Sequence, residues 1–146
     1  MDSIKRGIDK NFWDGYKDDW KKVSPHMAKL INTIINEREG EYLVIDTCHL
    51  YPEDIHKYDL EDTIIVFLGH DSISVDEKLK QIRKYDHHAW TNKENDEYMK
   101  YSTQLGIEYS IEAKKQCEEL GIKYFDTSFD FPKVKEEIIK YIEERL

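Results

Sequence analysis

The sequence lacks long apolar runs, an excess of positive charge and more than two cysteines. No apolar run is long enough to span a bilayer, so we expect no membrane association. The formal net charge is −9, and binding to a nucleic-acid backbone depends on Lys and Arg neutralising phosphates, which argues against general DNA or RNA binding. Cys48 and Cys117 lie far apart without metal-ligand spacing, as expected for a cytoplasmic protein with reduced thiols.

The 146 residues are expected to form a single α/β domain. Hydrophobic residues make up 39 % and charged residues 36 %, which supplies enough apolar side chains for one modest core. Strands that alternate with helices favour a parallel sheet packed between helices in three layers. Short apolar segments predict three buried strands, at residues 42–46, 63–68 and 122–126.

Helices are predicted between and after these strands from residues that begin or end helices. Ser24, which precedes a proline, is typical of an N-cap. Ser74 with Glu77 forms the pattern of a capping box, and Gly121 is typical of a helix stop. Pro132 is expected in the first turn of the last helix.

Polar residues follow each of the three predicted strands. In parallel sheets, ligands bind outside the carboxyl ends of the strands. The sequence therefore predicts a binding site formed by three short segments: Asp46-Thr47, Gly69-His70-Asp71 and Asp126-Thr127-Ser128.

Four segments, in order, resemble the small P-loop kinases of the adenylate kinase and shikimate kinase type. Residues 2–7 (DSIKRG) are similar to the segment that grips the phosphate acceptor, and residues 41–55 resemble the strand with the Walker B acid. Residues 64–91 resemble the next strand and the mobile lid, and residues 122–131 resemble the last strand and the loop that touches adenine. The resemblance covers nearly the whole chain.

This resemblance implies ATP and Mg²⁺ as cofactors, and a nucleotide or another small molecule as phosphate acceptor. Lys80 and Arg83 would be catalytic, neutralising charge on the transferring phosphoryl group, within or before a lid at residues 86–105. Asp46 would bind the metal indirectly, through a Mg²⁺-bound water. The alternatives are a solvated helix face for Arg83 and a turn-capping role for Asp46.

Two further pairs of residues would bind ligands by the same resemblance. Thr127 and Ser128 would contact the base of the nucleotide cofactor, although a polar turn explains them equally well. Lys5 and Arg6 would bind the phosphate or carboxylate of the acceptor, unless they are simply solvated near the chain terminus.

The chain departs from this family in lacking the phosphate-binding loop. The family begins with a strand and G-x-x-x-x-G-K-S/T, whose backbone N–H groups and lysine hold the phosphates. The six glycines here never have that spacing, and none precedes Lys-Ser or Lys-Thr. We therefore expect a sheet without its first, central strand, and a truncated or inactive kinase-like protein. Either the chain is a fragment of a longer kinase, or it is a short protein that has lost the loop.

A different function remains open, that of a non-catalytic α/β module that binds a protein partner or a nucleotide. Such a module could form a homodimer through an exposed sheet edge. Cys48 and His49 are neighbours in sequence, which is no evidence for a nucleophile–base pair, because catalytic partners meet in space. An interaction surface is suggested by a cluster of aromatic residues: Phe12, Trp13, Tyr16 and Trp20.

Overall fold

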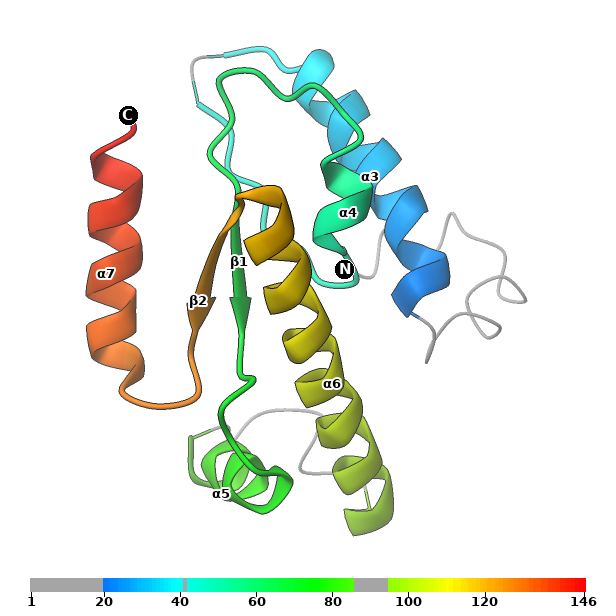
Figure 1. Cartoon of the computed structure of the whole chain (residues 1–146), viewed down its shortest axis with the longest axis vertical. Helices are drawn as coiled ribbons and strands as arrows, with labels where there is room; N and C mark the ends of the chain where they lie inside the picture. Colours follow the sequence, from blue (N-terminus) through cyan, green and yellow to red (C-terminus); the bar gives the residue numbers. More distant parts are fainter. Residues whose placement is uncertain (1–19, 41, 86–94) are drawn as a thin grey trace. The chain divides into compact units, whose positions relative to one another are not determined.

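The computed structural model describes residues 20–40, 42–85 and 95–146 (Figure 1). The chain divides into two compact units, Met1–Thr63 and Ile64–Leu146, and each is described by itself. Helices account for 60 % of the described residues. The single domain expected from the sequence stays a prediction.

The first unit contains two described helices, α3 (Trp20–Asn36) and α4 (Pro52–Ile55), which contact each other. Apolar side chains recur on α3 at helical spacing, so that one stripe of the helix is buried. The segment before α4 and α4 itself supply the opposing side chains. The buried apolar residues of this unit are Val23, Ala28, Ile31, Leu50, Tyr51 and Ile55.

The prediction that Ser24 caps α3 is wrong, because the helix already includes Trp20 and contains Pro25 in its interior. Ser24 is fully buried, and its Oγ accepts a hydrogen bond from the backbone N–H of Tyr51 at 2.7 Å. A buried backbone N–H without an acceptor would destabilise the folded state. Ser24 supplies this acceptor to Tyr51 from a distant part of the chain. The hydrogen bond to Tyr51, and not a helix cap, therefore explains why a serine is buried at position 24.

Replacing Ser24 with alanine should therefore destabilise the protein by about 1 kcal/mol, because the Tyr51 amide loses its acceptor. Urea denaturation followed by circular dichroism would measure the change in the free energy of unfolding. Thr33→Ala is the matched control, since the Thr33 hydroxyl is exposed and bonds only within the same helix. Equal effects of the two substitutions would show that the Tyr51 amide does not depend on Ser24.

The strand predicted at residues 42–46 is also wrong. This segment is irregular, and the Tyr42 and Val44 side chains are 77 % and 92 % exposed. Among the described residues, the only sheet has two strands, and neither of them pairs with this segment. An apolar, β-branched segment becomes a buried strand only where another strand and a covering helix are available. The apolar pattern alone was therefore insufficient to predict a strand here.

The second unit holds β1 (Val66–Gly69) and β2 (Lys123–Asp126), which pair in parallel, with Gly69 opposite Asp126. These strands confirm the segments predicted at residues 63–68 and 122–126, although both are shorter and β1 ends at Gly69, beyond the predicted bound. The expected three-stranded, three-layer sheet is wrong, since the described part has a two-stranded sheet and is mostly helical. The missing third strand is the exposed segment at residues 42–46.

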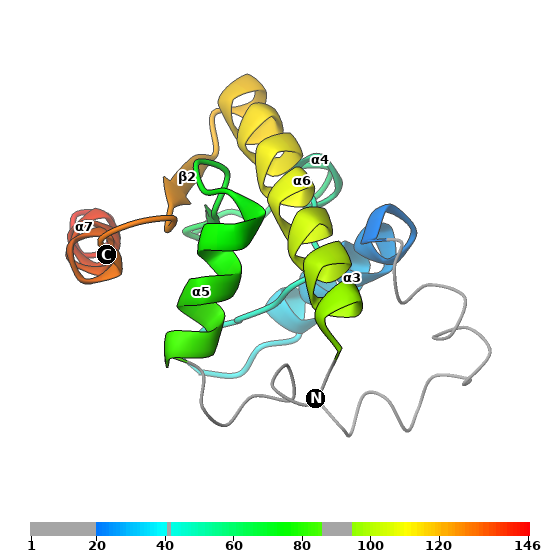
Figure 2. The ribbon, with the colours of Figure 1, turned by 90° about the horizontal axis from the view of Figure 1, so that it is seen from below.

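The described part of the second unit contains three helices: α5 (Val75–Tyr85), α6 (Asp96–Leu120) and α7 (Phe131–Glu143). Successive side chains of a strand point to opposite faces, and β2 shows this clearly. Tyr124 turns towards α6, whereas Phe125 packs edge-on against Tyr141 of α7 with ring centroids 5.8 Å apart. Figure 2 shows the strands between these two helices, and in Figure 1 α5 lies beyond their carboxyl ends.

The ends of these helices confirm the predicted signals. The Ser74 Oγ accepts from the Glu77 N–H while the Glu77 carboxylate accepts from the Ser74 N–H, which is the reciprocal capping box. Gly121 ends α6 in the left-handed conformation with φ 70°. Pro132 lies in the first turn of α7, two residues after the Asp130 cap.

Candidate functional site

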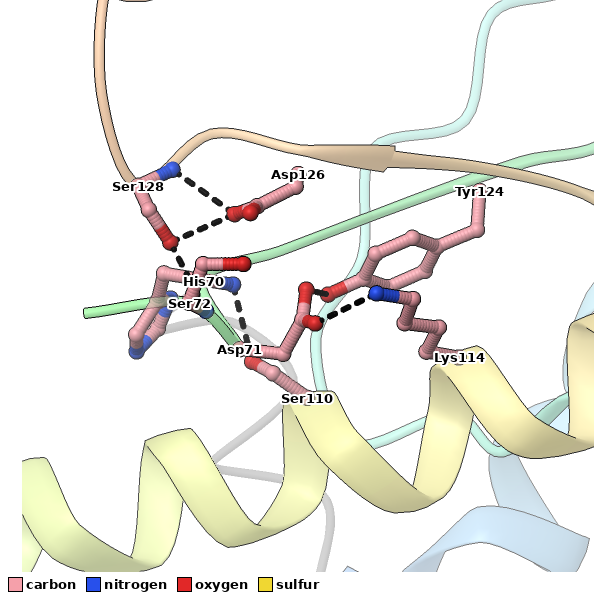
Figure 3. Close-up of polar contacts among 8 residues, drawn as sticks. All are labelled: His70, Asp71, Ser72, Ser110, Lys114, Tyr124, Asp126 and Ser128. Carbon is pink, nitrogen blue, oxygen red and sulfur yellow. Dashed lines mark hydrogen bonds and ion pairs between the residues drawn. The ribbon is translucent and has the colours of Figure 1, made fainter.

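Polar side chains converge beyond the carboxyl ends of β1 and β2 (Figure 3). Gly69 and Asp126 end the two strands opposite each other, and the Thr127 N–H donates to the Gly69 carbonyl at 2.7 Å. This edge of the sheet is where ligands bind in parallel α/β structures. Two of the three predicted segments therefore lie side by side, whereas Asp46-Thr47 belongs to the first unit.

Asp71 is the centre of the first polar group. Its side chain is only 9 % exposed, and it accepts hydrogen bonds from the Tyr124 hydroxyl at 2.8 Å and the Lys114 ammonium at 2.7 Å. Burial, together with the hydrogen bond to Asp71, raises the pKa of Tyr124, so the phenol stays a neutral donor. The same carboxylate raises the pKa of Lys114. The group is a satisfied network that ties α6 to β2 and to the segment after β1.

Asp126 is the centre of the second polar group. It accepts from the Ser128 hydroxyl at 2.5 Å and the Ser128 N–H at 2.9 Å, and the Ser72 N–H donates to the same hydroxyl at 3.1 Å. Burial alone would raise the pKa of Asp126, but hydrogen bonds from Ser128 and Ser72 outweigh it and lower that pKa. The carboxylate is therefore ionised. Gln81 of α5 donates to the Ser128 carbonyl at 2.8 Å, which holds that helix against the strand ends.

His70 and Lys78 are two further titratable side chains near this edge. The backbone N–H of His70 donates to the Ser110 Oγ at 3.1 Å. Burial, together with the nearby charge of Lys78, lowers the pKa of the His70 imidazole to about 4. Burial also lowers the pKa of Lys78, against the opposing effect of Asp126. The imidazole is neutral at neutral pH and is half-buried.

Gly69 allows the close packing on which this arrangement depends. A Cβ atom at this position would lie 2.1 Å from the Tyr124 hydroxyl oxygen and 2.9 Å from the Ser110 Cβ. Real side chains do not approach so closely, so this position admits no side chain unless its neighbours move.

The residues predicted as catalytic lie away from the two polar groups. Arg83 forms an ion pair with Asp96, both being exposed, and Lys80 is exposed on α5. Of the predicted lid, residues 86–94 lie outside the described residues, whereas residues 96–105 form the first turns of α6. The catalytic and lid roles stay predictions.

The predicted ligand-binding residues have different surroundings. The Thr127 hydroxyl donates to the Gly69 carbonyl at 2.8 Å, and Ser128 is fully buried against Asp126. Lys5 and Arg6 lie outside the described residues. Their roles as cofactor and substrate contacts stay predictions.

Asp46, the predicted metal contact, is exposed on the irregular segment of the first unit, and its role also stays a prediction. Three or more His, Cys, Asp or Glu side chains that could hold a metal ion are not found together among residues 20–40, 42–85 and 95–146. Cys48 does contact its neighbour, with the Sγ 2.9 Å from the His49 Nδ1. Burial raises the pKa of the Cys48 thiol and lowers the pKa of His49, so the contact does not produce a reactive thiolate.

Sequence reasoning missed Tyr124, Lys114, Lys78 and Ser110 as members of the site. A signal for two of them was present in α6. Small residues recur there at helical spacing, which lets a helix approach a strand closely, and Lys114 follows Ser110 by one turn. These small, buried residues are Gly106, Ser110, Ala113 and Cys117.

Comparisons of the chain with protein-family models, with curated proteins and with solved structures gave no match. In the described part of the chain, no helix combines the length and apolar character needed to cross a membrane.

Proposed function

We propose that the chain is a P-loop kinase-like, cytoplasmic protein that binds a nucleotide or another small phosphorylated molecule without transferring phosphate by itself. The observation that carries this proposal is the meeting of two polar segments, Gly69-His70-Asp71 and Asp126-Thr127-Ser128, at the carboxyl ends of parallel strands. The resemblance in the order of sequence segments supports the kinase family. Mg²⁺ and ATP would be the cofactors of a member that retains the family's chemistry.

The residues support the proposed absence of catalysis. In phosphoryl transfer, positioning and electrostatic stabilisation supply nearly all of the rate enhancement, and the phosphate-binding loop carries much of both. No such loop is encoded in residues 1–146. Arg83, the candidate for stabilising the transferring group, is paired with Asp96.

The purified chain should bind ADP or ATP in isothermal titration calorimetry and should not accelerate Mg²⁺-dependent ATP hydrolysis above the buffer rate. Thr127→Val should weaken nucleotide binding about tenfold, because a hydroxyl at the strand ends is lost. Thr33→Val, at an exposed position of α3, is the matched control and should leave the affinity unchanged.

Two outcomes would contradict parts of this proposal. Robust Mg²⁺-dependent turnover would overturn the absence of catalysis. A lack of binding by every nucleotide tested would overturn the binding function itself.

The second candidate is a non-catalytic module that binds a protein partner. The observation that favours it is the exposure of adjacent apolar side chains at Tyr42, Leu43 and Val44, because contiguous apolar surface often marks interaction sites. Of the aromatic cluster suggested by the sequence, only Trp20 is described, and it packs edge-on against His49. A homodimer through the sheet edge stays a prediction.

A further inference from the structure

Two nitrogen-bearing side chains, those of His70 and Lys78, lie near the strand ends on different elements. His70 directly follows β1, and Figure 3 shows its imidazole turned away from the Asp71–Tyr124 pair. Lys78 lies on α5, three residues before Gln81, whose side chain bonds the Ser128 carbonyl. Residues three apart share a helix face, so Lys78 also faces the strand ends.

These two side chains differ from their neighbours in having no polar partner. Among the described residues, neither the Lys78 ammonium nor the His70 imidazole forms a hydrogen bond or an ion pair. By contrast, Asp71 accepts hydrogen bonds from Tyr124 and Lys114, and Asp126 accepts from Ser128. Both unpaired side chains are half-buried, where water satisfies a donor less well than at an open surface.

We infer that Lys78 and His70 form an anion subsite that binds a phosphate group, carried by a nucleotide or present as inorganic phosphate. An ammonium offers three donors and a neutral imidazole offers one, which suits the several acceptor oxygens of phosphate. The inference rests on the proposed function, since the subsite would receive the phosphate of its ligand, but inorganic phosphate allows it to be tested separately.

The charges around His70 determine how phosphate binding would affect the protonation of its imidazole. Lys78 faces it from α5, Asp126 from β2 and Asp71 from its own segment, whereas α6 presents the uncharged Gly106 beside the ring Nε2. The two carboxylates and the cations Lys78 and Lys114 balance, so the empty site is near neutrality. A phosphate anion would shift this balance and favour the protonated imidazole. Phosphate binding should therefore raise the pKa of the His70 imidazole.

The test is an NMR titration of the imidazole in the whole chain, with the His70 resonances assigned from the His70→Gln variant. Without phosphate, the pKa of His70 should be about 4. With saturating inorganic phosphate, it should rise by about one pH unit or more, as expected for an opposite charge within a few ångströms.

Three variants separate the subsite from general electrostatics. Lys78→Met should abolish the effect of phosphate on His70, Lys78→Arg should retain most of it, and Lys135→Met, exposed on α7, should behave as wild type. Circular dichroism would verify that each variant is folded. An unchanged His70 pKa in wild type, or a Lys78→Met variant that responds like wild type, would overturn the subsite.

Repeating the titration with ADP distinguishes the subsite from the proposed function. A response of His70 to both ligands supports both. A response to inorganic phosphate but no binding of any nucleotide would overturn the proposed function and keep the subsite. Calorimetric binding of ADP with no response of His70 to either ligand would overturn the subsite alone.

Discussion

Replacing Gly69 with alanine is expected to lower the free energy of unfolding by about 3 kcal/mol, at the upper end of the usual cost of overpacking. The new Cβ would lie 2.1 Å from the Oη and 2.8 Å from the Cζ of Tyr124, and 2.9 Å from the Ser110 Cβ. Tyr124 cannot easily move, because its hydroxyl is bonded to Asp71, and Ser110 is fixed on α6. Urea denaturation followed by circular dichroism would measure the loss.

Gly106→Ala is the matched control for this prediction. Its Cβ would lie 3.2 Å from the end of the His70 side chain, and alanine improves helix propensity by about 1 kcal/mol, so we expect a change within about 1 kcal/mol. In a Tyr124→Ala background, the penalty for Gly69→Ala should shrink to about 1 kcal/mol, because residues in contact are not additive. If Gly69→Ala were tolerated as well as Gly106→Ala, the close packing at the strand ends would be wrong.

Asp71→Ala should lower the free energy of unfolding by about 2 kcal/mol, the second largest loss after Gly69→Ala. It removes the acceptor for both Tyr124 and Lys114, and hydrogen bonds to a charged group each contribute about 1.5–3 kcal/mol. The Lys114 contribution is discounted because that side chain is 40 % exposed and can be solvated. Chemical denaturation of wild type and variant would measure the difference.

Two comparisons make this result specific to the buried carboxylate. Asp59→Ala removes an exposed carboxylate and should change stability by less than about 0.5 kcal/mol. In a Tyr124→Phe background, the cost of Asp71→Ala should fall, because the two side chains share one hydrogen bond. An effect of Asp71→Ala equal to that of Asp59→Ala would mean that the network does not stabilise the unit.

Local signals predicted the parts of the fold that local physics determines. The Ser74–Glu77 capping box, the left-handed Gly121 and the proline of α7 each act within one helical turn, so the sequence is sufficient to identify them. The polar ends of β1 and β2 were predictable for a related reason. Parallel strands bring their carboxyl ends to one edge, whatever the intervening chain does.

The errors all depend on contacts between distant residues. The apolar pattern of residues 42–46 gives no information on whether a strand partner is available, and Ser24 is buried because of Tyr51, a contact that no local motif encodes. Lys78 and Tyr124 were missed since a lysine on a helix and a tyrosine in a strand have common structural roles. Only the packing of α5 and α6 against the strand ends distinguishes them.

The partial burial of α7 has a consequence for the dynamics of the second unit. None of its residues is buried, and its apolar stripe is only half-covered, whereas α6 contributes several buried side chains. Local opening costs least where little apolar surface is covered. α7 is therefore expected to open independently of β1, β2 and α6, and to do so far more often than the unit unfolds. Amide hydrogens of α7 would then exchange through local fluctuations, while those of α6 would require a larger, cooperative opening.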